Sequence, residues 1–329
     1  MLSDTDYLFS SSFLRAGEGL GTSAERLTRM LEAPSPQQLY QTVADIFQTP
    51  LPTPGEAVFD RAFHDAVERV RTAVPDFPVF YPLLYKYDCT NIKTAVKCAA
   101  MGYRSYDRFY TCGTIPPAQI QECLQKDVFH GLPRAMGEAA AAVRLEYAKT
   151  GEARCIDLSL DRACFADMEE SAKAGGIPLM MQIVSMRADF VNISACLRIR
   201  QSGMPPEAAW TLLLRAFVPG GQVDRAALYS EETGCKDIAQ IYESLEDGDV
   251  KKAVRRALGK EPGRVEKIFD DALLLACLPY RFKAFGPEVV IRYLLIREAE
   301  LMNGRLLAAR FTSSKDDDKI RERLREVHV

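Results

Sequence analysis

The sequence predicts an all-α protein, and three observations lead to that prediction. Apolar residues recur three and four positions apart along most of the 329 residues, which is the spacing of one helix face. No run alternates apolar and polar residues as a half-buried strand does. Prolines and glycines interrupt the chain at short intervals, as in Pro205-Pro206 and Pro219-Gly220-Gly221, so short joints separate the predicted helices.

These joints set the limits of the expected helices. The proline-rich stretch 50–54 precedes a helix, and the pairs Pro116-Pro117 and Pro205-Pro206 suit the first turn of two others. Gly102 and Gly203 are suitable residues to end two helices. We expect helices over 4–16, 22–32, 36–47, 55–73, 79–101, 116–126, 133–149, 156–174, 178–202, 205–217, 235–245, 248–258, 261–278, 287–310 and 316–326.

The three asparagines of the chain mark an internal repeat. Each follows an acidic residue by three positions, and eleven residues after each asparagine comes a small residue that can end a helix. The three copies are Asp88-x-x-Asn91 with Gly102, Asp189-x-x-Asn192 with Gly203, and Glu300-x-x-Asn303 with Ser314. The asparagines are 101 and 111 residues apart. This period predicts three similar helical units around a pseudo-threefold axis.

The repeat also predicts where the units divide. We place the first helical unit at 51–130, the second at 131–245 and the third at 246–329. The third unit is short after Ser314, whereas the N-terminal segment 21–31 has a Gly-led start similar to those of 113–124 and 221–228, which continue the first two units. We therefore expect the N-terminal helices of 1–50 to complete the third unit.

Composition and charge exclude several classes of protein. A net charge of −3 with interspersed signs indicates no global field for nucleic acid or a membrane surface. No apolar stretch approaches the roughly 18 residues of a membrane span, and the first residues do not resemble a signal peptide, so a cytoplasmic location is expected. The nine cysteines include no Cys-x-x-Cys pair and are interpreted as reduced, buried thiols.

The acid and the asparagine of each copy share one helix face, because positions three apart are neighbours on a helix. That face is otherwise largely apolar, so the polar pair needs hydrogen-bond partners. Three interpretations are open: the pairs join helices within the protein, they contact a partner, or they are solvated. The candidate structural or partner-binding residues are Asp88, Asn91, Lys93, Asp189, Asn192, Glu300, Asn303 and Arg305.

Two further functions remain as alternatives at this point. One is a magnesium-dependent diphosphate enzyme that would use Asp88, Asp189, Glu300 and the pair Asp270-Asp271, but each helix of the repeat offers a single carboxylate rather than a dense acidic cluster. The second alternative is a helical adaptor with another protein client. We expect no catalytic residue, no cofactor and no metal ligand.

Three segments carry a resemblance to a known family. They are 81–97 with its acid-x-x-Asn-hydrophobic-Lys pattern, 297–310 with acid, asparagine and arginine, and the opening 27–39. Together they resemble the C subunit of V/A-type rotary ATPases, whose eukaryotic counterpart is the d subunit. The resemblance spans nearly the whole chain.

The resemblance implies a mechanical role. It implies a funnel of three helical domains that seats the central shaft, made of the D and F subunits, on the membrane ring of proton- or sodium-carrying subunits and transmits torque. The protein would then lie peripherally on the cytoplasmic membrane. Basic residues after the asparagines would pair with acidic groups on the shaft; these are Lys93, Lys97, Arg198, Arg200, Arg305 and Arg310. The second copy has Ser194 where the others have Lys93 and Arg305.

Overall fold

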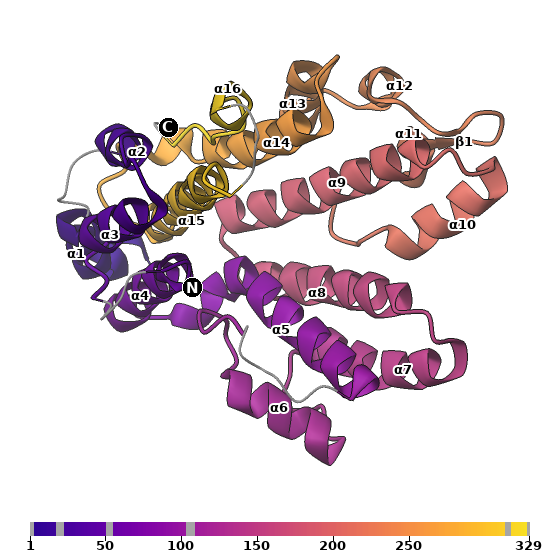
Figure 1. Ribbon diagram of the computed structural model, residues 1–329, viewed down its shortest axis with the longest axis horizontal. Coiled ribbons are helices and arrows are strands. Elements are labelled where there is room, and N and C mark those ends of the chain that lie inside the picture. The colour runs from indigo at the N-terminus through magenta and orange to yellow at the C-terminus, as the bar shows by residue number, and fades with distance from the viewer. Residues whose placement is uncertain (1–2, 18–22, 51–54, 103–108, 313–316, 328–329) are drawn as a thin grey trace. The chain divides into compact units, whose positions relative to one another are not determined.

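The computed structural model describes residues 3–17, 23–50, 55–102, 109–312 and 317–327. The chain divides into two compact units, and each is built almost wholly of helices (Figure 1). One unit combines Met1–Phe77 with Gly259–Val329, and the other is Pro78–Leu258. The predicted all-α class is confirmed.

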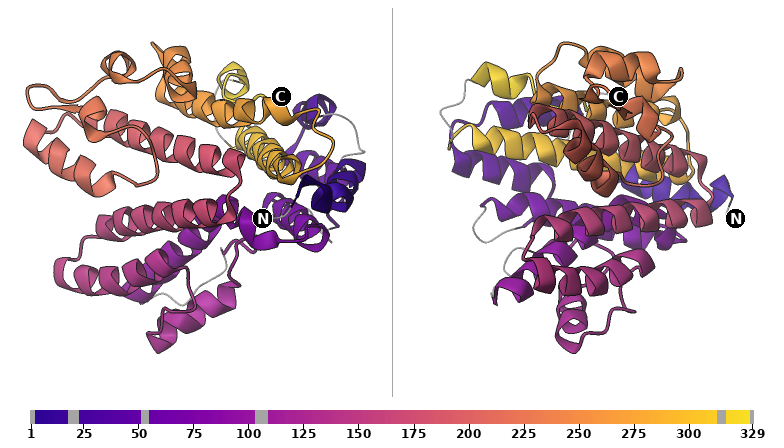
Figure 2. Two further views of the ribbon diagram at one scale, coloured as in Figure 1. Left: turned by 180° about the vertical axis from the view of Figure 1, so that it is seen from behind. Right: turned by 90° about the vertical axis from the view of Figure 1, so that its right-hand side faces the viewer.

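The first unit joins the two ends of the chain. Its helices contact one another across more than two hundred residues of sequence, and α15 lies against α2, α3 and α4 (Figure 2). Its elements are η1 (Asp4–Tyr7), α1 (Leu8–Gly17), α2 (Ser23–Leu31), α3 (Pro36–Ile46), α4 (Ala57–Ala73), α14 (Pro262–Ala276), η3 (Leu278–Tyr280), α15 (Pro287–Ala309) and α16 (Asp317–Arg321); η2 (Phe77–Phe80) leads into the second unit.

The second unit is a continuous stretch of the chain. Helix α8 packs against α5, α7 and α9, and α9 in turn contacts α10 and α13. Its elements are α5 (Tyr81–Met101), α6 (Pro117–Lys126), α7 (Arg134–Thr150), α8 (Arg154–Gly175), α9 (Pro178–Gln201), α10 (Pro206–Ala216), α11 (Arg225–Leu228), β1 (Tyr229–Ser230), β2 (Gly234–Cys235), α12 (Ile238–Ser244) and α13 (Asp249–Ala257).

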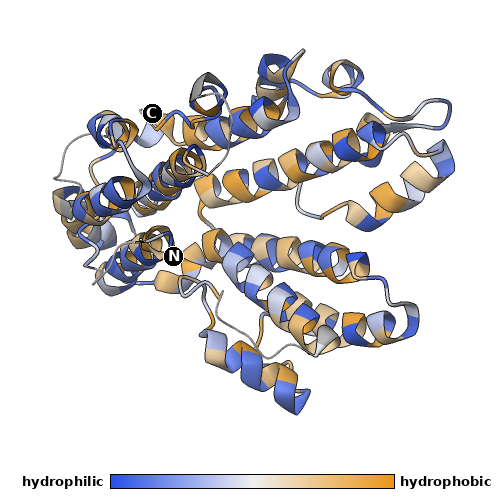
Figure 3. Cartoon of the chain, in the orientation of Figure 1, coloured by the Kyte–Doolittle hydropathy of each residue, from blue (hydrophilic) through white to orange (hydrophobic). Residues whose placement is uncertain are grey.

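Helices α9 and α15 form the centres of the two hydrophobic cores. Each has buried residues on all of its faces, including runs such as Val289–Ile291 on α15 and Ile183–Val184 on α9. A helix that is apolar all round is stable only when neighbours cover it on every side. In Figure 3 the first turns of α9 are mainly hydrophobic, whereas α13 is largely hydrophilic. The second and third copies of acid-x-x-Asn therefore lie on these core helices, and Asp88 and Asn91 of the first copy are buried on α5.

Two of the three predicted helix stops adopt the expected backbone. Gly102 and Gly203 have φ angles of 71° and 65°, the left-handed conformation that glycine favours after a helix. Ser314 lies outside the described residues, and α15 already ends at Ala309.

The predicted helix over 235–245 is wrong at its beginning, and no strand was expected there. Tyr229 and Ser230 of β1 pair antiparallel with Cys235 and Gly234 of β2. Helix α12 starts only at Ile238, because the side chain of Asp237 accepts hydrogen bonds from two backbone N–H groups of its first turn. The four-residue helix α11 was also not predicted.

The predicted helix over 316–326 is also wrong, since α16 ends at Arg321. Both backbone groups of Arg325 bond the side chain of Asn303, and the backbone N–H of Glu326 donates to Asp271. A helix would use these groups for its own hydrogen bonds. Hydrogen bonds with side chains of α14 and α15 thus replace those of a helix.

The division into three units stays a prediction.

Candidate functional site

The three asparagines make the same pair of hydrogen bonds. Each amide group donates through Nδ2 to a backbone carbonyl and accepts at Oδ1 from the N–H of the same residue. The Nδ2–O and N–Oδ1 distances are 2.8 and 2.9 Å for Asn91 with Tyr110, 3.0 and 2.8 Å for Asn192 with Val218, and 3.0 and 2.7 Å for Asn303 with Arg325. All three asparagine side chains are fully buried.

This geometry explains why asparagine stands at these positions. A side-chain amide is both a donor and an acceptor, so it can satisfy both polar groups of one peptide residue. Aspartate would lack the donor, and an apolar residue would leave two buried backbone groups unpaired. The residues joined lie 19, 26 and 22 positions apart in the chain. Each asparagine therefore attaches a core helix to the segment that follows it.

The acids of the first two copies bind the start of a later turn. Asp88 accepts from the backbone N–H groups of Thr114 and Ile115 at 3.0 and 3.1 Å, and from the Thr114 hydroxyl at 2.7 Å. Asp189 accepts from the N–H of Val223 at 2.8 Å. Burial raises the pKa of Asp189, although hydrogen bonds from the backbone of Val223 and Gln222 act in the opposite direction.

Glycine precedes each of these bonded turns for a steric reason. A Cβ atom on Gly113 would come closer than 3.0 Å to Oδ1 of Asp88, and one on Gly221 would come equally close to Oδ1 of Asp189. The carboxylate occupies the space that any other side chain would need. The Gly-led turns of the repeat are thus paired with its acids.

The third copy departs from this arrangement. Glu300 is buried and bonds two arginines: its Oε1 lies 2.6 Å from Nη2 of Arg26, and its Oε2 lies 2.8 Å from Nη1 of Arg297. The backbone bond that the acids of the other copies make is supplied by Asp271, which accepts from the N–H of Glu326 at 2.8 Å. Burial raises the pKa of Asp271, although Lys267 lies 2.6 Å away.

The repeated geometry coincides with a family match. The family described as the ATP synthase (C/AC39) subunit matches residues 52–323, a range that contains all three asparagines. The chain belongs to this family. The resemblance to the C subunit of V/A-type rotary ATPases is confirmed.

Two related proteins are similar to this member of the C/AC39 family over most of their own length. The C subunit of the A-type ATP synthase of Pyrococcus horikoshii is 25% identical over 347 residues, which cover 98% of this chain and 91% of the relative. The C subunit of the V-type sodium ATPase of Enterococcus hirae is 19% identical over 262 residues, which cover 79% of this chain and 78% of the relative.

The basic candidates of this C/AC39 family member have partners within their own unit. Lys93 lies 2.5 Å from Asp161, and Arg305 pairs with Asp60. The other basic residues after the asparagines bond similarly: Lys97 to Asp157, Arg198 to the Ser194 carbonyl, Arg200 to the Cys235 carbonyl, and Arg310 to the carbonyls of Leu31 and Ala33. Their expected contacts with acidic groups of a partner stay a prediction.

The acids considered for magnesium are also engaged. Asp270 lies 2.8 Å from Arg325, so the pair Asp270-Asp271 faces two cationic side chains rather than an open space. Within the described ranges, no group of three or more His, Cys, Asp or Glu side chains is arranged to hold a metal ion. All nine cysteines are free thiols. Among the described helices, none is long and apolar enough to cross a membrane.

Arg26 and Asp167 also make buried contacts, and neither was predicted from the sequence. Arg26 is buried against Glu300 although 274 positions separate them, and no local pattern marks such a pair. Asp167 on α8 accepts hydrogen bonds from the backbone of Ala135 and Met136 at the start of α7. It thereby supplies from another helix the cap that Pro133 cannot provide.

Proposed function

We propose that this protein is a non-catalytic rotor subunit of a V/A-type ATPase. It seats the central shaft, made of the D and F subunits, on the membrane rotor ring and transmits torque for proton or sodium transport. In this role it is a peripheral subunit on the cytoplasmic side of the membrane. Family membership over 52–323 and the similarity to two C subunits of such ATPases support the proposal.

The double hydrogen bonds of the asparagines carry the mechanical part of the proposal. A subunit that transmits torque must not let its helices turn independently of the segments beside them. Each asparagine holds two backbone groups at once, so the peptide it binds is fixed in orientation as well as position. The buried location of all three protects these bonds from exchange with water.

The three-unit, pseudo-threefold funnel is part of the same proposal. The contacts of Arg26 with Glu300 and of Arg310 with the carbonyls of Leu31 and Ala33 support the assignment of the N-terminal helices to the third unit. Three equivalent units would spread the load of a rotating shaft over three sites. In this proposal Asp88, Glu300 and the three asparagines are internal connections rather than contact residues.

A binding experiment tests the function and the role of the acids together. Purified wild-type protein is expected to bind an immobilised complex of the D and F subunits and to bind the isolated membrane ring. Asp88→Ala and Glu300→Ala are expected to lower the stability of the fold, with binding lost only in proportion to unfolded protein. Glu68→Gln, at a half-exposed ion pair on α4, serves as the control.

The outcomes separate the two parts of the proposal. If the wild-type protein binds neither the shaft nor the ring, the rotor function is wrong. If Asp88→Ala and Glu300→Ala keep wild-type stability but lose binding, these acids are contact residues and their internal role is wrong.

A further inference from the structure

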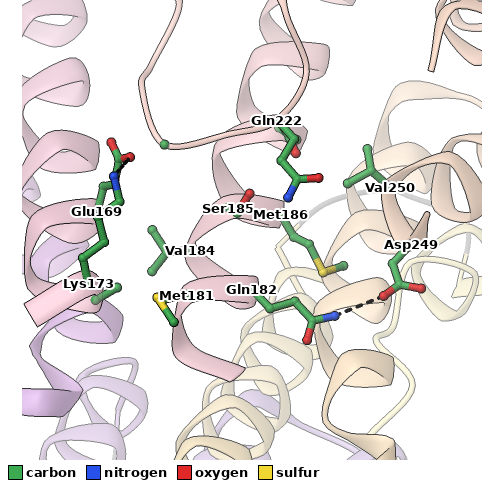
Figure 4. Close-up of a pocket in the computed structure, with 13 residues that line it drawn as sticks. Glu169, Lys173, Met181, Gln182, Val184, Ser185, Met186, Gln222, Asp249 and Val250 are labelled. Atoms are coloured by element: carbon green, nitrogen blue, oxygen red, sulfur yellow. Dashed lines mark hydrogen bonds and ion pairs between the residues drawn. The ribbon is translucent and has the colours of Figure 1, made fainter. Parts of the chain in front are cut away.

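A cavity of about 420 Å³ lies within the second unit (Figure 4). Its walls come from the end of α8, the first half of α9, the turn 220–222 and the start of α13. This volume is in the range of sites for small ligands, ~300–1,000 Å³, and exceeds the space taken by one side chain. The cavity therefore has room for a side chain together with part of the segment that presents it.

Asp189 of the repeat lines this cavity. It is 1% exposed, and its side chain bonds the backbone of Val223 and Gln222. Asp88 in the first copy accepts an additional hydrogen bond from the Thr114 hydroxyl, but Gln222 stands at the corresponding position after the glycine of the second copy. In the described part of the chain, no hydroxyl or cationic group bonds Asp189. The hydroxyl bond that Asp88 accepts in the first copy thus has no counterpart at Asp189.

The charges around the cavity favour a cation. Three carboxylates, those of Glu169, Asp189 and Asp249, line it together with a single ammonium group, Lys173. Lys173 lies 2.5 Å from Glu169. Asp249 accepts from Gln182 at 3.1 Å, as the dashed line in Figure 4 marks, and it also pairs with Lys252 at 3.0 Å. Asp189 is left as the buried carboxylate whose charge is not balanced from the cavity walls, and an incoming cation would reduce the cost of its burial.

The remaining walls favour an aliphatic stem. Met181, Val184, Met186 and Val250 also line the cavity, and in Figure 4 the first two lie toward Lys173 and the other two toward Asp249. Methionine side chains are flexible and polarisable, so they adapt to chains of different shape. Lysine and arginine combine such a stem with a cationic end that can reach a recessed carboxylate.

We propose that this cavity binds a lysine or arginine side chain of another subunit of the complex, with the cationic end paired to Asp189. The partner assignment rests on the rotor function proposed above, whereas the preference of the cavity for an alkyl cation does not. Asp189 then has two roles: it holds the turn after Gly221 through the backbone of Gln222 and Val223, and it receives the cationic end of the partner's side chain.

The preference of the cavity is tested on the isolated, full-length protein. Wild-type protein with ¹³C-methyl methionine is titrated with n-butylguanidinium, and the methyl signals of Met181 and Met186 are followed by NMR. Saturable shifts are expected, together with none from n-pentanol, which has a similar stem and no charge. Asp189→Asn should weaken binding of n-butylguanidinium at least about tenfold. Asp167→Asn, a buried backbone-bonded aspartate that does not line this cavity, should change it less than about twofold.

A second variant keeps the carboxylate and fills the site. Gln222→Lys places an ammonium group on the turn beside Asp189 and should abolish the shifts without unfolding the protein. The proposed cation site is wrong if the wild type shows no shifts, or if the shifts are unchanged in Asp189→Asn and Gln222→Lys. This conclusion does not depend on whether the protein binds the shaft.

The partner is tested separately with the immobilised complex of the D and F subunits. Asp189→Asn and Gln222→Lys should each weaken binding of folded protein about tenfold, and Asp167→Asn should not. Unchanged binding to both shaft and ring by variants that have lost the n-butylguanidinium site would overturn the partner assignment. Failure of the wild type to bind either partner counts instead against the rotor function.

Discussion

Arg26 and Glu300 form a buried ion pair across 274 residues of sequence, with 2.6 Å between Nη2 and Oε1. Arg297 completes the arrangement from the other side of the same carboxylate and stacks near Phe47 and Tyr293. The carboxylate is shared by two guanidinium groups in a site that excludes water. The pair thereby joins the two ends of the chain in one core.

Removal of this carboxylate should be strongly destabilising. Glu300→Gln removes the buried negative charge with which both Arg26 and Arg297 pair, and we expect it to lower the free energy of unfolding by about 3–5 kcal/mol. Urea denaturation measures the change. Glu68→Gln, in the half-exposed pair with Arg71, should cost less than about 1 kcal/mol. Equal effects of the two variants would contradict the importance of burial.

The hydrogen-bond donor of an asparagine in the repeat can be removed without a change in the size of the side chain. Asn192→Asp deletes the N–H that binds the Val218 carbonyl and places a charge in the core. We expect a loss of about 1–3 kcal/mol or more in the free energy of unfolding, as for other buried groups left without a partner. Gln201→Glu makes the same chemical change on an exposed residue at the end of the same helix and should have little effect. Calorimetry of both variants distinguishes the two sites.

The cost of adding a side chain at Gly221 should depend on the carboxylate of Asp189 beside it. Gly221→Ala is expected to destabilise the protein by about 1–3 kcal/mol, because the new methyl group overlaps Asp189. Gly55→Ala, where nothing lies within 4 Å of the added methyl group, is the control. In the double variant Gly221→Ala with Asp189→Ala, the two losses should not add. Additive losses would show that the overlap is relieved elsewhere.

The raised pKa of Asp189 predicts a dependence of stability on pH. Its ordinary value is 3.8, and burial raises it in the folded protein. The folded state then binds this proton more tightly than the unfolded state, so the contribution to stability is present at low pH and is lost as the pH rises through the folded pKa. The stability of the wild type relative to Asp189→Asn should therefore fall as the pH rises above 3.8. A difference that rises with pH in urea denaturation series would have the wrong sign.

Local patterns predicted the helices of this protein well. Proline and glycine set most helix limits, and the recurrence of acid-x-x-Asn located the two central helices, α9 and α15, as well as α5. These signals lie within one or two turns of the residues they govern. The sequence could therefore indicate which polar side chains need hydrogen-bond partners.

The contacts made by those residues could not be predicted in the same way. Asn303 prevents a helix at Arg325, and Asp237 delays the start of α12, but only the first of these acts across a distance. The third copy looks equivalent to the others in sequence, although Glu300 binds arginines and Asp271 makes the backbone bond. Packing against a distant segment decides which acid plays which part.

The partners of the three asparagines are a tyrosine, a valine and an arginine, and all three are bound through backbone atoms alone. Any residue with a backbone N–H can stand there, so proline is the one substitution that the bond itself forbids. The bond to the asparagine thus places no demand on the side chain at the bound position, although Arg325 also pairs with Asp270. An alignment would reveal one end of each connection and give no trace of the other.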